Sequence, residues 1–155
     1  MSNYVIIVAG GKGLRMGSDI PKQFLPVGNK PVLMRTISRF HEYDKSINII
    51  LVLPKEQQAY WKELCDKYHF YEEYTLTDGG DTRFQSSKNG LMMIPDGEEG
   101  LVGIHDGVRP FVSISTIARC YDTAGDTYAA IPVMPATDTL RYIDKQGCLL
   151  YTSPS

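Results

Sequence analysis

Basic side chains lie within and just after a glycine-rich stretch near the start of the chain, and together they suit the binding of an anion. The apolar run from Val5 to Ala9 leads into GGKG, and the same segment carries Lys12, Arg15 and Lys22 but only one acid, Asp19. Glycine has no Cβ, so such a loop can bring backbone N–H groups against a phosphate, while the cations supply charge. We therefore expect an anionic ligand here, in a chain whose formal net charge is −2.

The spacing of these residues excludes two common phosphate-binding loops. A Walker loop needs Ser or Thr directly after a Gly-Lys pair, and a dinucleotide-binding fingerprint needs glycine where Met16 stands. The pattern that remains is Gly11-x-Gly13-x-Arg15-Met16, followed after four residues by Pro21-Lys22-Gln23. This pattern resembles the signature loop of the sugar-phosphate nucleotidyltransferases. The glycines taken alone would equally suit an ordinary turn between a strand and a helix.

A second glycine-rich stretch, DGGDTRFQSSKNGL, runs from Asp78 to Leu91. We expect Asp81 or Thr82 to cap a helix there, because short polar side chains accept hydrogen bonds from first-turn N–H groups. The glycine pair before the cap permits a close backbone approach, which suits an anion or the polar edge of a base. A capped helix without a ligand is the alternative. Helical spacing is expected to place Phe84, Ser87 or Lys88, Leu91 and Ile94 on one side of this helix.

A carboxylate directly follows another predicted strand. Residues 101–104 read LVGI, and His105 and Asp106 come next. In open α/β sheets, ligands bind at the carboxyl ends of the strands, so we expect Asp106 to face the same crevice as the first loop. It is the best metal-ligand candidate, because Mg²⁺ can join a carboxylate to a triphosphate that it would otherwise repel. The alternative is that Asp106 only caps the turn at Gly107.

The hydrophobic pattern predicts an α/β protein with parallel strands and covering helices. Continuous apolar runs are typical of strands buried on both faces, and they occur at 5–9, 47–53, 101–104 and 128–133, with a weaker strand at 74–77. Helical spacing is found at 31–43, 55–68 and 113–123, and residues 140–143 are expected to pair with 148–151 as a hairpin. After residue 133 the chain is predicted to leave the sheet at the ligand-binding edge, which would place Thr139 and Arg141 beside a second substrate.

Composition favours a single globular domain over residues 1–155, with 43% hydrophobic and 22% charged residues. No apolar run reaches the about 20 residues of a membrane span, and no signal peptide is recognisable, so we expect a cytoplasmic protein without a membrane partner. The slightly negative net charge and the lack of a basic stripe argue against nucleic acid as a partner. Three widely spaced cysteines form no CxxC motif, which predicts neither a disulfide framework nor a zinc site.

Four blocks between residues 5 and 141 agree in order and spacing with one family: VAGGKGLRMGSDIPKQF, GGDTRFQSSKNGL, IHDGVRPF and PATDTLR. They resemble the 2-C-methyl-D-erythritol 4-phosphate cytidylyltransferases of the non-mevalonate isoprenoid pathway. The resemblance implies a three-layer nucleotidyltransferase fold with a mostly parallel central sheet and, usually, a homodimer. It also implies an enzyme that uses Mg²⁺ to join CTP and a polyol phosphate, with release of diphosphate.

The same resemblance assigns roles to individual residues. Arg15 and Lys22 would stabilise the transition state, with a planar fork and a compact charge respectively. Asp106 would lie near the metal and the ribose. The remaining assignments are the triphosphate loop Ala9, Gly10, Gly11, Lys12 and Gly13, the cytidine contacts Gly80, Asp81 and Ser86, and the substrate contacts Asp106, Arg109, Thr139 and Arg141.

The chain departs from the family pattern at Ser87, where valine is usual, and at Gly107 and Val108, where alanines are usual. Family members also continue well beyond this point, with a dimerisation arm and further basic residues, so we expect the chain to be incomplete at its C-terminus. Two alternatives stay open. One is cytidylyl transfer to another polyol phosphate, such as ribitol 5-phosphate, and the other is a catalytically silent nucleotide-binding fragment.

Replacing Lys22 with alanine is expected to reduce turnover about a hundredfold, while CTP binding changes far less. Nucleotidyl transfer develops negative charge at the phosphates, and a cation whose contact strengthens as that charge develops contributes about 3 kcal/mol or more. Steady-state kinetics measures the effect, and circular dichroism checks that the variant is folded. Unchanged turnover would remove Lys22 from the mechanism.

Overall fold

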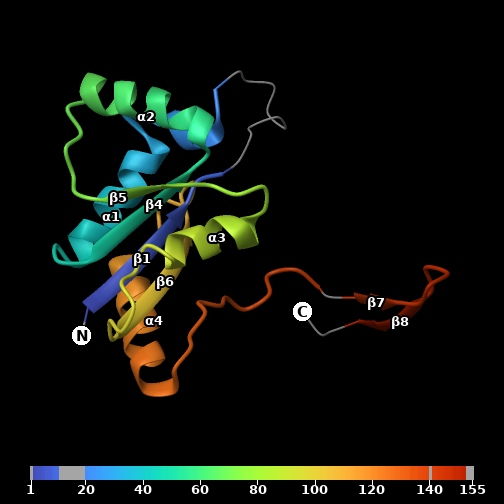
Figure 1. Cartoon of the computed structure of the whole chain (residues 1–155). Coiled ribbons are helices and arrows are strands. Elements are labelled where there is room, and N and C mark those ends of the chain that lie inside the picture. Colours follow the sequence, from blue (N-terminus) through green and yellow to red (C-terminus); the bar gives the residue numbers. More distant parts are fainter. Residues whose placement is uncertain (1, 11–19, 140, 153–155) are drawn as a thin grey trace.

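A parallel sheet forms the centre of the computed structural model, which describes residues 2–10, 20–139 and 141–152 (Figure 1). Among these residues the sheet has four strands in the order β5-β4-β1-β6, and every neighbouring pair is parallel. The strands are β1 (Ser2–Val8), β4 (Asn48–Leu53), β5 (Thr75–Asp78) and β6 (Gly100–Asp106). This confirms the prediction of an α/β fold with a mostly parallel sheet.

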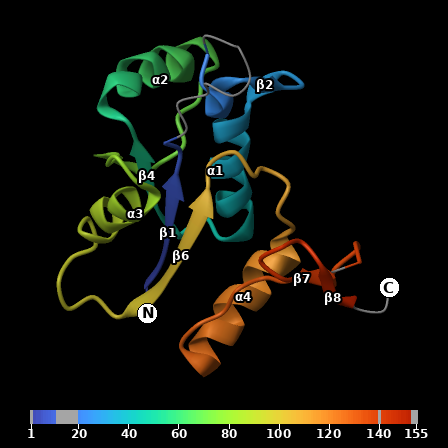
Figure 2. The same ribbon diagram turned by 90° about the vertical axis from the view of Figure 1, so that its right-hand side faces the viewer.

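Helices cover both faces of this sheet. α1 and α3 lie on opposite sides of β1 and β6 (Figure 2). The helices are α1 (Val32–Tyr43), α2 (Lys55–Lys67), α3 (Arg83–Leu91) and α4 (Ile114–Thr127), and a short 3-10 helix, η1, spans Lys22–Phe24. Two small antiparallel hairpins complete the described elements, β2 (Pro26–Val27) with β3 (Lys30–Pro31), and β7 (Arg141–Ile143) with β8 (Leu149–Thr152). None of the described helices has the length and apolar character that crossing a bilayer requires.

The central strand β1 contributes to two apolar clusters, one on each face of the sheet. Val5 and Ile7 are fully buried in the larger cluster, which contains side chains of α1, α2 and α4. Ile6 alternates to the other face, where it packs with residues of β4 beneath α3. Trp61 of α2 is 1% exposed, as expected of a core anchor. Burial on both faces explains why these strands read as continuous apolar runs.

α3 packs on the sheet through its small residues and not through the side that carries Phe84 and Leu91. Phe84 and Leu91 are 76% and 44% exposed, whereas Ser86 and Gly90 are buried against the sheet. A Cβ built on Gly90 would lie 2.5 Å from Cγ2 of Ile6, so the helix backbone itself approaches the strand. The smallest side chains of α3 therefore form the contact, because they permit the closest packing. The predicted cap is correct: Thr82 precedes the helix and forms a capping box with Gln85.

The predicted strand over residues 128–133 is also absent. Tyr128 ends α4 in a left-handed conformation, and the segment beyond it runs as an extended chain away from the sheet towards the β7–β8 hairpin (Figure 1). Ile131 and Val133 are 81% and 80% exposed. In the described chain β6 pairs with β1 alone, so its outer edge is free, but residues 128–133 do not pair with it.

The register brings the carboxyl ends of the strands to one edge. Val8 of β1 lies opposite Val52 on one side and Asp106 on the other, and Leu53 lies opposite Asp78. The chain builds β4 and β5 on one side of β1 and then crosses to form β6 on the other. The direction in which strands are added to the sheet thus reverses between β1 and β6. Open α/β sheets bind ligands at such a point.

Alanine at position 90 is expected to destabilise the protein by about 1 to 3 kcal/mol, because its Cβ would overlap Ile6 and force α3 away from the sheet. Gly125 of α4 provides a matched control, since a Cβ there meets only Leu101 at 3.8 Å. Gly125→Ala should be stabilising by about 0.5 to 1 kcal/mol through the better helix propensity of alanine. Urea unfolding measures both, and equal effects of the two substitutions would contradict this packing.

Candidate active site

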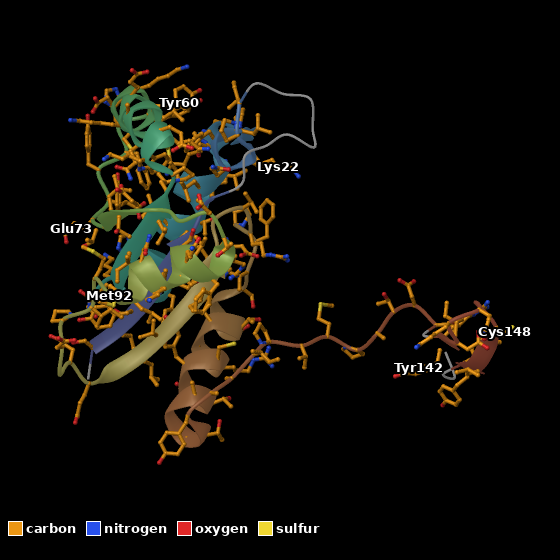
Figure 3. All side chains as sticks on the ribbon, turned by 45° about the vertical axis from the view of Figure 1, so that its right-hand side comes forward. Lys22, Tyr60, Glu73, Met92, Tyr142 and Cys148 are labelled. Carbon is orange, nitrogen blue, oxygen red and sulfur yellow. The ribbon has the colours of Figure 1, made fainter. Side chains whose placement is uncertain are left out.

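A pocket of about 290 Å³ lies at the carboxyl ends of β1 and β6. Its walls come from the end of β1, the turn that carries Lys22, the loop before α3 and the end of β6. Lys22 is at this end of the molecule (Figure 3). The lining residues are Val8, Ala9, Gly10, Lys22, Gln23, Gly80, Asp81, Thr82, Arg83, Ser86, Asp106 and Val108.

Most of the assigned residues that the structure describes meet in this pocket. The assigned residues that line it are Ala9, Gly10, Lys22, Gly80, Asp81, Ser86 and Asp106. Arg109 lines an adjoining pocket of about 660 Å³, to which Asp106 and Arg83 also contribute. Gly11, Lys12, Gly13 and Arg15 lie outside the described residues, so their assignments stay predictions.

Thr139 and Arg141 are not brought to this pocket. Thr139 is exposed on the chain that follows α4, and Arg141 is exposed at the start of β7. The hairpin that contains Arg141, marked by Tyr142 and Cys148, lies well apart from the sheet (Figure 3). A substrate contact at either residue therefore stays a prediction from the sequence.

The loop before α3 is held in shape by side chains of the helix that it precedes. The backbone N–H of Gly80 donates to Ser86 Oγ over 3.0 Å, and Thr82 and Gln85 exchange hydrogen bonds across the first turn. A Cβ on Gly80 would lie 2.4 Å from Cβ of Gln85, so only glycine fits here. The buried Ser86 thereby fixes the rim formed by Gly80 and Asp81.

Asp106 is held between two arginines. Its Oδ1 accepts from Arg83 Nη2 over 2.7 Å, and its Oδ2 accepts from Arg109 Nε over 2.8 Å. Partial burial alone would raise the pKa of Asp106, but the hydrogen bonds and charges of Arg109 and Arg83 outweigh it and hold the pKa below the ordinary value of 3.8. The carboxylate is therefore ionised at neutral pH and neutralises part of the positive charge of the site.

Arg83 was missed in the sequence analysis. It is the first residue of α3, where the helix dipole favours an acid rather than a cation. The arginine is stabilised here by its ion pair with Asp106, at the end of β6. An arginine in the first turn of a capped helix, beside a glycine-rich loop, is the signal that could have identified it.

His105 is a packed residue at the end of β6. Its ring meets Phe40 edge to face at 5.0 Å, and its Nε2 lies 2.9 Å from the carbonyl oxygen of Arg109. Burial lowers the pKa of His105, although the neighbouring carbonyl and Asp106 oppose the shift. The neutral imidazole thus supports the turn that carries Arg109.

The described residues hold no group of three or more His, Cys, Asp or Glu side chains able to enclose a metal ion. Asp106 is a single carboxylate, and each of its oxygens already accepts from an arginine. Mg²⁺ is usually bound through one or two carboxylates together with substrate phosphates. The site therefore fits Mg²⁺ only if phosphate oxygens of a bound nucleotide supply the other ligands.

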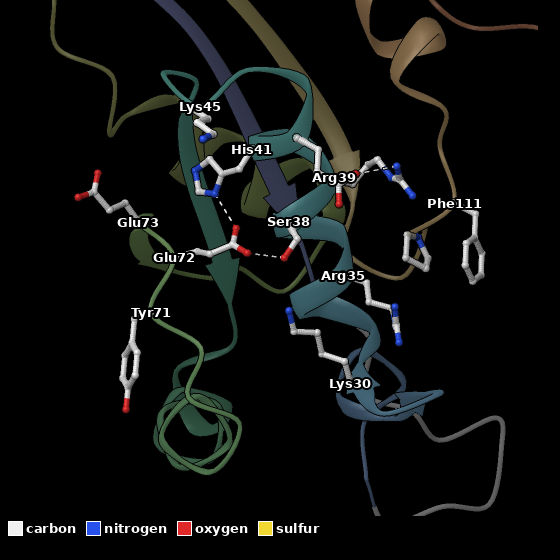
Figure 4. A pocket seen from close by; sticks show the side chains of 12 residues that line it. Lys30, Arg35, Ser38, Arg39, His41, Lys45, Tyr71, Glu72, Glu73 and Phe111 are labelled. Carbon is white, nitrogen blue, oxygen red and sulfur yellow. Dashed lines mark hydrogen bonds and ion pairs between the residues drawn. The ribbon is translucent and has the colours of Figure 1, made fainter.

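A separate hollow of about 650 Å³ lies between α1 and the segment before β5 (Figure 4). Its floor is formed by Glu72, which accepts a hydrogen bond from Ser38 and lies 2.6 Å from Nδ1 of His41. These contacts attach the segment to α1. Neither Lys22 nor Asp106 lines this hollow, so it is separate from the pocket described above.

Arg83→Met is expected to raise the pKa of Asp106, which a carboxyl ¹³C NMR titration measures. A carboxylate with a lowered pKa contributes stability above its unfolded-state pKa, and this contribution is lost as the pH falls through the folded-state pKa. The variant should therefore be less stable at pH 7 by about 0.2 to 1 kcal/mol, the range for exposed ion pairs, and this deficit should vanish in acid. Arg119→Met, on the exposed side of α4, should leave both quantities unchanged.

Comparison with known proteins agrees with the geometry. The chain is 61% identical over 147 residues to the 2-C-methyl-D-erythritol 4-phosphate cytidylyltransferase of Phocaeicola vulgatus, which covers 95% of this chain and 66% of the relative. The enzyme of the same name from Bacteroides thetaiotaomicron is 58% identical over the same coverage. The crystal structure of 4-diphosphocytidyl-2C-methyl-D-erythritol synthase from Anaerococcus prevotii superposes with a TM-score of 0.81 at 29% identity, over 99% of this chain and 63% of that one.

The chain spans about two thirds of the length of the curated relatives that it matches. The family described as 2-C-methyl-D-erythritol 4-phosphate cytidylyltransferase, IspD, matches residues 3–154. The match covers nearly the entire chain, and the pocket gathers residues from three of the four sequence blocks at the switch point of the sheet. This chain belongs to the IspD family.

Proposed function

We propose that this chain carries the nucleotide-binding site of an enzyme that transfers CMP from CTP to 2-C-methyl-D-erythritol 4-phosphate, in isoprenoid precursor biosynthesis. The observation that carries the proposal is the pocket that combines Lys22, the Gly80–Asp81 rim and Asp106 at the carboxyl ends of β1 and β6. Membership of the family supports the choice of CTP and of the polyol phosphate.

The reaction needs positioning and charge neutralisation more than acid–base chemistry. A phosphate oxygen of the polyol phosphate attacks the α-phosphorus of CTP in line, and the bond from that phosphorus to the bridging oxygen breaks. The diphosphate leaves with the electron pair. Because the nucleophile is already an anion, no strong general base is required, and Lys22 together with Arg15 would stabilise the charge that develops on the phosphates.

The other residues would bind and orient the two substrates. We assign the backbone from Ala9 to Gly13 to the triphosphate and the rim of Gly80, Asp81 and Ser86 to the cytidine. On the other side of Asp106, Arg109 and Arg83 face the adjoining pocket, where two cations suit the phosphate of the polyol substrate. Contacts from Thr139 and Arg141 require the segment that carries them to approach this pocket.

Mg²⁺ would enter with the triphosphate, with Asp106 as its protein ligand, and would neutralise charge between the phosphates. We also propose that the whole protein is cytoplasmic and homodimeric, and that residues 1–155 belong to one nucleotidyltransferase domain. These properties follow from the family resemblance and from composition.

A catalytically silent nucleotide-binding fragment is the second candidate. It is favoured by the position of the β7–β8 hairpin, which lies apart from the sheet (Figure 1). In such a fragment the CTP site would form while the second substrate would not be held.

Diphosphate release tests the proposal. Purified chain is incubated with CTP, Mg²⁺ and either 2-C-methyl-D-erythritol 4-phosphate or ribitol 5-phosphate, and CTP binding is followed by calorimetry. We expect CTP binding and release with the erythritol phosphate. Binding without release identifies the silent fragment, release with ribitol 5-phosphate alone identifies the other polyol-phosphate enzyme, and absence of CTP binding contradicts the proposed site.

A further inference from the structure

Gln23 is the one wholly buried polar side chain among the described residues that line the candidate active site. It follows Lys22 directly in η1, so its side chain and that of Lys22 leave the same short turn. Lys22 is half-buried and lines the pocket, whereas Gln23 is 0% exposed. A long polar side chain is rarely buried to this extent unless hydrogen bonds hold it.

The hydrogen bonds of Gln23 connect three parts of the molecule. Its Nε2 donates to the carbonyl oxygen of Ala9 over 3.0 Å and to Oε1 of Gln57, in the first turn of α2, over 2.6 Å. The carbonyl of Ala9 can only accept, so the amide orientation of Gln23 is fixed and both of its N–H groups are used. Ala9 is anchored in turn, because its own N–H donates to Val52 of β4 over 3.0 Å.

We propose that Gln23 is a positioning residue, which sets the distance between Lys22 and the backbone that leaves β1. Ala9 is the last residue before the glycine-rich loop, and Lys22 stands at the far end of the same segment. The amide of Gln23 ties these two ends directly to each other and to α2. The inference rests on the proposed function, in which Lys22 acts at the phosphates that this loop binds.

The neighbouring contacts explain why the amide is needed in addition to apolar packing. Phe24 anchors the turn in the core, where its ring stacks on Trp61 with centroids 6.0 Å apart. Apolar contacts hold the turn in place but are not directional, whereas hydrogen bonds fix an orientation. A displacement of about 1 Å at a catalytic group can reduce a rate about a hundredfold.

Gln23→Met tests the inference, because methionine has a similar length but no donor. Gln58→Met is the matched control: Gln58 also donates from α2 to a strand-end carbonyl, that of Leu53, but it does not line the pocket. We expect kcat to fall at least tenfold in Gln23→Met, with the KM for CTP changed less than threefold, and to stay unchanged in Gln58→Met. On a Lys22→Ala background, Gln23→Met should cause no further loss, since it acts through Lys22.

Hydrogen exchange supplies a readout that does not depend on activity. The amides of Phe24 and Leu25 donate within the turn, to Pro21 and Lys22. They should exchange at least tenfold faster in Gln23→Met than in the unmodified chain, while the β4 amides keep their protection. If Gln23→Met does not fold, Gln57→Met replaces it as the test. This substitution, at a half-exposed position, removes the acceptor of the Gln23–Gln57 hydrogen bond and should give a smaller increase in the exchange of the same two amides.

Unchanged exchange in the turn overturns the inference whether or not the chain is active. Faster exchange with unchanged kcat, or rate losses that add to those of Lys22→Ala, overturns it as well. An unmodified chain that binds no CTP and releases no diphosphate contradicts the proposed function instead. In that case, hydrogen exchange of the Phe24 and Leu25 amides alone decides whether Gln23 fixes the position of Lys22.

Discussion

The site depends on β1 being hydrogen-bonded along both of its sides. β4 and β6 flank this strand in parallel register, and its apolar side chains are buried on both faces of the sheet. The end of such a strand has little freedom, so Ala9 and Gly10 leave the sheet from a fixed position. Everything that lines the pocket is placed relative to that point.

Three further contacts fix the surroundings of the strand end. Gly107 donates to the carbonyl of Val8 over 2.8 Å, and Thr36 of α1 donates to the carbonyl of Gly107 over 2.8 Å. On the opposite side, Gly79 donates to the carbonyl of Leu53 over 2.8 Å. The loops after β5 and β6 are therefore tied to the strands beside them, which gives a rigid frame around a cavity that is open to a ligand.

The charged side chains of the site are held in place by one another. Arg83 of α3 and Arg109 of the turn after β6 share the two oxygens of Asp106, and Lys22 lines the same pocket as Asp106. The cations are thereby kept at the site by a partner on the rigid strand β6. An anionic substrate that enters meets oriented donors, which lowers the reorganisation that binding requires.

Local sequence patterns determined most of the elements, because they depend on interactions between near neighbours. The runs of apolar residues identified β1, β4 and β6, and the Thr82 cap with its glycine pair identified the start of α3. The strand-end argument placed Asp106 at the same edge as the first loop, and the family resemblance assigned Lys22, Gly80, Asp81 and Ser86 to the same site.

Tertiary structure decided the features that depend on partners far apart in the sequence. The face of α3 that packs on the sheet follows from how closely Gly90 lets the helix approach Ile6, which helical periodicity alone does not reveal. The run at 128–133 is apolar enough for a strand, yet strand formation also requires the backbone to lie along a sheet edge, and this segment runs away from the edge of β6 that is free in the described chain (Figure 1). Likewise, the pairing of Arg83 with Asp106 and of Gln23 with Ala9 arises only when the folded chain brings those groups within hydrogen-bonding distance.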